Sequence, residues 1–204
     1  MKAETPVVLV HGFLSTRQLM LPFKWQLARY GYQVSQPALS FLCIQDVRQL
    51  ADQLARAVDE QCRQHDVDQV DLVGISQGGI IGLYYLLHRG GSARIRRLVM
   101  VGSPVRGSYA ALGGLPLLGL VSKGIRQIRP GAAFLETLAH DLPTGARVMT
   151  ISVVRDLVAP PARCAVESAE QNVVIDGPLG PFKHQWIAMS PAVVRHVDRL
   201  LSVD

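Results

Sequence analysis

Residues 70–79 of this 204-residue chain read VDLVGISQGG, and this stretch decides the fold. Its first six residues form a largely apolar run of strand length, and residues 77–89 have a helical pattern that ends at two glycines. The Gly-X-Ser-X-Gly pattern at 74–78 therefore lies at a predicted strand-to-helix turn. A turn this sharp strains the backbone of its serine, here Ser76, and requires glycine two residues before and two residues after it. The stretch predicts an elbow that presents the Ser76 hydroxyl at the end of a strand.

Short apolar runs and helical patterns alternate along the rest of the chain. The runs lie at about residues 6–10, 32–35, 70–75, 98–101, 148–154 and 173–175. One helical pattern follows residues 15–16, another extends from Ser40 to about His65, and a last one follows Ser190. Apolar strands that alternate with helices form a mostly parallel sheet covered on both faces. We therefore predict an α/β fold with about six mostly parallel strands and helices on both faces.

The sequence predicts one domain, residues 1–204, with an insertion at about residues 107–141. Hydrophobic residues make up 49% of the chain and charged residues 18%, which is typical of globular proteins. Glycines and prolines interrupt the insertion, and one of its possible helical faces carries Leu117, Leu118 and Val121. Two interpretations stay open. The insertion is either a lid-like element that lines a substrate pocket and touches a lipid surface, or an ordinary helix packed on the sheet.

Charge and cysteine content limit the partners of the chain. The net charge is +5, but the arginines form no dense basic run and no nucleic-acid motif accompanies them, so we expect no nucleic-acid partner. The cysteines, Cys43, Cys62 and Cys164, lack metal-ligand spacing, which predicts reduced structural thiols and no metal site. We see no signal peptide before the first strand and expect a cytoplasmic protein, unless a leader was removed.

A serine hydroxyl needs a base within reach, and the base needs an acidic partner that fixes its tautomer. After such an elbow the usual chain order is acid, then histidine. The histidines that follow Ser76 are His88, His140, His184 and His196. His184 lies in the loop after the last predicted strand, and sites in parallel sheets form at the carboxyl ends of strands. The other three lie in helical patterns or in the insertion, so we expect His184 to be the base.

Three aspartates are candidates for the acid: Asp141, Asp156 and Asp176. Asp156 directly follows the strand predicted at residues 148–154, and this places it at the carboxyl edge of the sheet. Asp141 precedes the same strand and so belongs to the opposite edge. Asp176 ends the last strand and stays a rival. We expect Asp156 to be the acid.

Acyl transfer also needs hydrogen-bond donors for the oxyanion, each worth roughly 10²–10³ in rate. One donor is expected from the backbone amide of Gln77, the residue after Ser76. The other is expected from the loop after the first strand, where His11-Gly12-Phe13 stands. We assign this second donor to the amide of Phe13.

Together these motifs resemble the bacterial lipase and esterase branch of the α/β-hydrolase superfamily. The matching pieces follow the family's order over nearly the whole chain: VVLVHGF at 7–13, GISQGG at 74–79, GSPVRGS at 102–108, Asp156 with Val158 and Pro160, and His184. Many relatives have histidine where this chain has Ile75. The direct start at the His-Gly strand is similar to the compact lipases that lack the fold's two leading strands.

The resemblance implies a triad of Ser76, His184 and Asp156, no cofactor, and esters of lipids or fatty acids as substrates. The expected activity is that of a serine carboxylesterase or lipase that forms an acyl-enzyme on Ser76. Two alternatives stay open. The same triad could serve an acyltransferase or a thioesterase, because a fold and its nucleophile do not fix the acceptor. The chain could also be a hydrolase-like scaffold that binds a lipid or a protein without catalysis.

Overall fold

A single six-stranded sheet organises the computed structural model, which describes residues 5–40, 43–113, 122–138, 142–176 and 183–202. The strand order is β2-β1-β3-β4-β5-β6, and every neighbouring pair is parallel. The strands are β1 (Val7–Val10), β2 (Val34–Ser35), β3 (Val70–Ile75), β4 (Ile95–Val101), β5 (Arg147–Val153) and β6 (Gln171–Ile175). The prediction of about six mostly parallel strands is confirmed.

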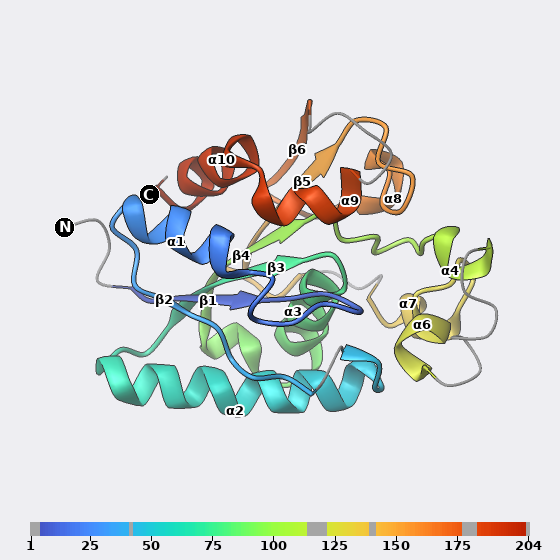
Figure 1. Cartoon of the computed structure of the whole chain (residues 1–204). Helices are drawn as coiled ribbons and strands as arrows, with labels where there is room; N and C mark the ends of the chain where they lie inside the picture. Colours follow the sequence, from blue (N-terminus) through green and yellow to red (C-terminus); the bar gives the residue numbers. More distant parts are fainter. Residues whose placement is uncertain (1–4, 41–42, 114–121, 139–141, 177–182, 203–204) are drawn as a thin grey trace.

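Helices cover both faces of this sheet, so two separate apolar cores form (Figure 1). On one face lie α2 (Val47–His65) and α3 (Gln77–His88); on the other lie α1 (Leu21–Arg29) and α10 (Pro191–Ser202). The shorter elements are η2 (Gly91–Ala93), α4 (Ala110–Gly113), α6 (Lys123–Gln127), α7 (Ala133–Glu136), α8 (Pro161–Cys164), α9 (Lys183–Trp186) and η3 (Ile187–Met189). Within the described residues, no helix combines the length and the apolar character that crossing a bilayer requires.

The most deeply buried helix is α3, the helix that the elbow begins. All of its residues from Gln77 to Leu86 are buried between the sheet and α2. Small residues permit this close packing: a Cβ on Gly79 would lie 2.1 Å from the Ser103 hydroxyl, and one on Gly82 would lie 2.7 Å from a Leu72 methyl group. The elbow is therefore fixed by tight contact on both sides of its helix.

Two helices begin later in the chain than the sequence predicts. The helix expected from Ser40 begins at Val47, because Asp46 caps it and its carboxylate accepts a hydrogen bond from the Arg48 amide at 2.9 Å. The helix expected after residues 15–16 begins at Leu21, where Pro22 occupies the first turn. The residues before Leu21 instead form turns that pass over the carboxyl edge of the sheet.

Because all strands are parallel, their carboxyl ends lie at one edge of the sheet. The chain runs from β1 outward to β2 and then returns across β1 to β3, so the direction of strand addition reverses between β1 and β3. Ligands of such sheets bind outside the carboxyl ends of the strands at this point. The fold therefore brings the loops after β1, β3, β5 and β6 to one place.

Candidate active site

Ser76 occupies the sharp turn between β3 and α3. Its φ of 56° and ψ of −125° are a conformation that non-glycine residues rarely adopt. A Cβ on Gly74 would lie 2.4 Å from the Gly79 nitrogen, and one on Gly78 would lie 2.3 Å from the Val10 carbonyl oxygen. Positions 74 and 78 must therefore be glycine, as the sequence pattern predicts. The strained backbone at Ser76 directs its side chain into a cavity.

The structure brings Ser76, His184 and Asp156 into one hydrogen-bonded row. The imidazole Nε2 of His184 lies 2.8 Å from the Ser76 Oγ, and its Nδ1 lies 2.7 Å from Oδ2 of Asp156. The carboxylate can only accept, so we assign the ring proton to Nδ1, and Nε2 then accepts a hydrogen bond from the Ser76 hydroxyl. Three residues that are far apart in the sequence thus meet as the sequence predicts.

Asp156 is buried and its carboxylate is held at both oxygens. While Oδ2 accepts from His184, Oδ1 accepts from the backbone amides of Val158 at 2.8 Å and Ala159 at 3.1 Å. Burial by itself raises the pKa of Asp156, but the bond and charge of His184 and the two amides outweigh burial and leave this pKa below its ordinary value. The group is therefore an ionised, fixed acceptor at neutral pH.

The rival residues that the structure describes do not join this row. The His88 Nε2 lies 2.7 Å from the Thr137 carbonyl oxygen, at the opposite end of α3 from Ser76, and His196 lies on α10. Asp176 is exposed at the end of β6. His140 and Asp141 lie outside the described residues.

The loop after β1 passes directly against the elbow. A Cβ on Gly12 would lie 2.9 Å from the Ser76 Cβ and 3.2 Å from the Gln77 nitrogen, so only glycine fits. Phe13 follows it at the cavity wall, and Gln77 is the first residue of α3. The amides of Phe13 and Gln77, predicted as oxyanion donors, therefore belong to two segments that touch beside Ser76.

His11, which precedes this loop, is a buried support that the sequence did not single out. Its Nδ1 lies 3.1 Å from the Gly12 carbonyl oxygen and 3.5 Å from the Cys43 sulfur. Burial lowers the pKa of His11 and raises that of the Cys43 thiol to about 12, so both groups are neutral at neutral pH. The neutral His11–Cys43 pair therefore supports the loop that contains Gly12 and adds no charge to the site.

Ser76 and His184 open into a cavity of about 560 Å³, which we call the elbow cavity. Its walls are mainly apolar and come from the loops after β1 and β5, the segment after β4, α6, and α9 with η3. The apolar members are Phe13, Leu14, Leu19, Met20, Pro104, Ala110, Ala111, Ile125, Ile128, Val158, Trp186, Ala188 and Met189. The exposed members Leu14, Leu19, Trp186 and Met189 form its rim. The predicted pocket residues Leu117, Leu118 and Val121 lie outside the described residues.

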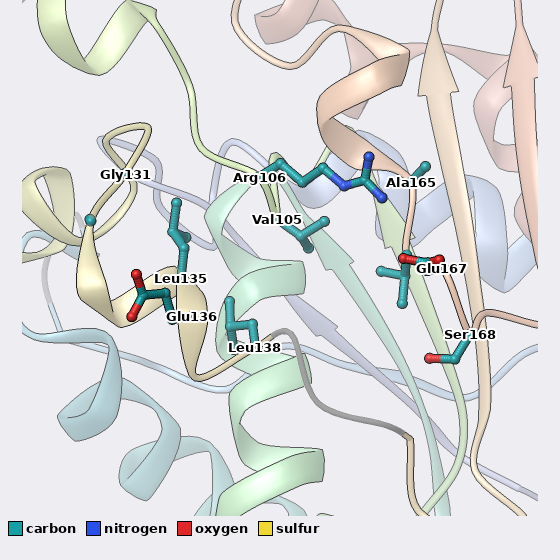
Figure 2. A pocket seen from close by; sticks show the side chains of 11 residues that line it. Val105, Arg106, Gly131, Leu135, Glu136, Leu138, Ala165, Glu167 and Ser168 are labelled. Carbon is teal, nitrogen blue, oxygen red and sulfur yellow. The ribbon is translucent and has the colours of Figure 1, made fainter.

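A second cavity of about 540 Å³ is lined in part by Val105 and Arg106 of the segment after β4 (Figure 2). Pro104 and Ser108 of this segment line the elbow cavity, whereas Val105 and Arg106 line the second cavity. Leu135 and Leu138 belong to its buried floor, while the charged side chains of Arg106, Glu136 and Glu167 are exposed. Residues 104–108 are therefore a wall shared by two cavities of similar size.

The described residues contain no group of three or more His, Cys, Asp or Glu side chains arranged to hold a metal ion. The hydrogen-bonded row beside the elbow cavity instead consists of a hydroxyl and an imidazole that line the cavity and a buried carboxylate behind them. This set is the one that nucleophilic acyl chemistry uses.

Comparison with known proteins agrees with this architecture. A family model described as "alpha/beta hydrolase fold" matches residues 5–118. No curated protein is similar enough in sequence to match. The solved structure of Bacillus licheniformis lipase BlEst2 in its mature form superposes with a TM-score of 0.82 at 17% identity and covers 100% of this chain and 94% of that protein.

Two eukaryotic lipases have the same fold. Aspergillus fumigatus lipase B gives a TM-score of 0.77 at 17% identity over 98% of this chain, which spans 53% of that protein. A soluble variant of monoglyceride lipase from Saccharomyces cerevisiae gives a TM-score of 0.70 at 14% identity, and the match covers 98% of this chain and 86% of that protein. At these identities the likeness concerns the fold alone.

Proposed function

The chain belongs to the α/β-hydrolase family, and on this premise we propose that it is a serine esterase of the lipase type with Ser76 as its nucleophile. The observation that carries the proposal is the unbroken row from the Asp156 carboxylate through His184 to the Ser76 hydroxyl, with distances of 2.7 and 2.8 Å. The row ends in a mainly apolar cavity, which suits a substrate with an apolar acyl chain.

The proposed reaction has two halves. The Ser76 Oγ attacks the ester carbonyl carbon while its proton passes to His184 Nε2, and the imidazolium then gives this proton to the leaving alcohol. Water next loses a proton to the same Nε2 and attacks the acyl carbon. The bond from this carbon to the Ser76 Oγ breaks, the Oγ takes the proton back from Nε2, and the free acid leaves. Asp156 keeps the proton on Nδ1 and stabilises the imidazolium that forms in each half.

The backbone amides of Phe13 and Gln77 are the proposed donors to the oxyanion. The close approach of Gly12 to Ser76 supports this assignment, because it brings the loop after β1 against the first turn of α3. The amide of Gln77 also lies at the N-terminus of α3, where the helix dipole favours negative charge. Both donors are backbone groups, so they need no rearrangement during the reaction.

Hydrolysis of nitrophenyl esters from acetate to palmitate tests the proposal. We expect activity with acyl chains longer than acetate, and we expect Ser76→Ala to lower kcat by at least about 10⁴-fold. Ser168→Ala, a serine of the second cavity, is the matched control and should retain wild-type activity. Activity in Ser76→Ala equal to the wild type would refute the nucleophile.

Two further measurements separate this function from its alternatives. An active-site phosphonate should label Ser76, whereas a scaffold that only binds lipid would stay unlabelled. Product analysis with added alcohols and amines separates a hydrolase from an acyltransferase, and thioester substrates separate an esterase from a thioesterase. We expect the free acid to be the main product.

A further inference from the structure

Ser108 is a buried serine in the wall between the two cavities. Its side-chain hydroxyl donates a hydrogen bond to the Val158 carbonyl oxygen at 2.5 Å, and its backbone amide donates to the Ile128 carbonyl oxygen at 2.9 Å. Ser108 follows β4, whereas Val158 lies in the loop after β5 that contains Asp156. The hydroxyl thus links the cavity wall to the segment that carries the acid.

The carbonyl group that Ser108 contacts belongs to the same peptide unit as the Ala159 amide. That amide donates to Oδ1 of Asp156 at 3.1 Å. A hydrogen bond accepted by a peptide carbonyl polarises the peptide and strengthens the donor at its other end. A short relay therefore runs from the Ser108 hydroxyl, through the Val158–Ala159 peptide, to the oxygen of Asp156 that does not face His184.

We propose that Ser108 is a positioning residue for the Asp156–His184 pair and acts through the Val158–Ala159 peptide. The inference rests on the proposed function and adds a residue to it. Without the Ser108 hydroxyl, the half-buried Val158 carbonyl loses this hydrogen bond, the peptide can rotate, and one of the two amides that fix Asp156 is weakened. The imidazole of His184 then loses the fixed acceptor that orients it toward Ser76.

Few other groups face this carboxylate. His184 is its hydrogen-bonded partner, and the charge of Asp156 also acts on the Cys164 thiol, whose Sγ donates to the Ala159 carbonyl oxygen at 3.2 Å. The loop is thus held on both sides, by Ser108 at one peptide and by Cys164 at the next. The Ser108 contact reaches this loop from the wall of the elbow cavity.

The chain offers a matched control in Ser103. Ser103 is buried in the same segment, but its hydroxyl makes only a long contact of 3.5 Å to the Val101 carbonyl oxygen. Ser103→Ala removes a buried hydroxyl without touching the loop of Asp156. Ser108→Thr keeps the hydroxyl, and Ser108→Cys replaces it with a weak donor of similar shape.

Kinetics and one proton signal test the inference. We expect Ser108→Ala to lower kcat roughly tenfold with KM within twofold of wild type, as the loss of one buried hydrogen bond predicts. The downfield NMR signal of the proton between His184 Nδ1 and Asp156 should shift or broaden. Ser108→Thr should restore kcat and signal, Ser108→Cys should be intermediate, and Ser103→Ala should match the wild type.

Several outcomes would overturn this role. A wild-type kcat in Ser108→Ala, an unchanged proton signal, or an effect confined to KM would each do so, as would equal losses in Ser103→Ala. If Ser108→Ala fails to fold, the Cys and Thr variants decide the matter by the same two readouts. The proton signal reports on the resting protein, so it separates failure of the inference from failure of the proposed esterase activity, which Ser76→Ala decides.

Discussion

The elbow cavity and the second cavity differ little in size, about 560 and 540 Å³, and they share the wall formed by residues 104–108. Their contents differ. At the elbow cavity the Ser76 hydroxyl and the His184 imidazole line the wall, and a buried carboxylate from the loop after β5 supports the imidazole from behind. In the second cavity the charged groups are exposed around an apolar floor (Figure 2). A site therefore depends on convergent strand ends, and cavity volume alone does not identify it.

The two cavities also differ in backbone strain. Leu14 and Ser76, which line the elbow cavity, have φ values of 51° and 56°, and Arg155, which precedes Asp156, has 61°, although none is glycine. The positive-φ residue that lines the second cavity is Gly131, with φ of 77°, which glycine adopts without strain. Strain of this kind persists where the surrounding structure over-determines it, often at functional sites.

The largest expected difference in kcat comes from neutralising one carboxylate beside each cavity. Asp156→Asn keeps the shape of the acid but removes its charge and favours the wrong tautomer of His184, so we expect kcat to fall by about 10³–10⁴-fold. Glu167→Gln, in the second cavity, should leave kcat for a nitrophenyl ester unchanged. A loss below tenfold in Asp156→Asn would remove the contrast between the cavities.

Filling each cavity tests where the acyl chain lies. Ala110 lines the elbow cavity and Ala132 the second one, and both are half-buried. Ala110→Phe should lower kcat/KM for the palmitate ester at least about tenfold while the acetate ester changes little, because the added ring shortens the cavity. Ala132→Phe should leave the ratio of the two esters unchanged. Equal shifts in both variants would mean that the elbow cavity does not hold the chain.

The raised pKa of the Cys164 thiol predicts how the free energy of unfolding changes at alkaline pH. Burial raises the pKa of Cys164 from 9.0 to about 12, so the folded protein keeps the thiol protonated where the unfolded chain ionises. This contribution to stability is complete below pH 9 and is lost as the pH rises toward 12. Between pH 8 and 11 the free energy of unfolding of Cys164→Ala should decline roughly 2–3 kcal/mol less than that of the wild type.

Urea unfolding as a function of pH measures this difference. Cys62 is the matched control, because it is less deeply placed and Arg94 opposes the rise of its pKa. Cys62→Ala should therefore change the slope less than Cys164→Ala. Parallel curves for wild type and Cys164→Ala would show that the thiol is not protected by burial.

The smallest expected effect concerns strain at the turn before Asp156. Arg155 is exposed and has positive φ, so Arg155→Gly should raise the free energy of unfolding by about 0.5–1 kcal/mol. Arg155→Ala keeps the penalty and should not stabilise. Urea denaturation compares the two, and an equal change in both variants would argue that side-chain contacts, rather than φ, set the effect.

Sequence alone predicts the sheet and the edge at which the candidate site residues lie, for a physical reason. Ser76, Asp156 and His184 each follow a recognisable apolar strand, and parallel strands bring such positions to one edge. The sequence predicts the tight turn at Ser76 equally well, because the backbone atoms around it leave no space for a Cβ at the two glycine positions.

The cavity wall was far less predictable. Leu14, Leu19, Trp186 and Met189 lie in turns or short helices without a periodic pattern, so nothing in their spacing indicates a shared rim. Their position in the sequence is the one available indication, since all four lie within a few residues of Phe13 or His184. The contact between Ser108 and Val158 joins loops 50 residues apart and depends on how the two loops pack.

The burial of α3 has a consequence for how activity is lost on heating. The elbow is the first turn of a helix whose residues from Gln77 to Leu86 are all enclosed between the sheet and α2. Amide protons of such a helix exchange only when the whole domain opens, so this segment should belong to the slowest-exchanging unit of the molecule. Ser76 would then lose its geometry in the same cooperative event that melts the sheet, with no earlier local opening at the nucleophile.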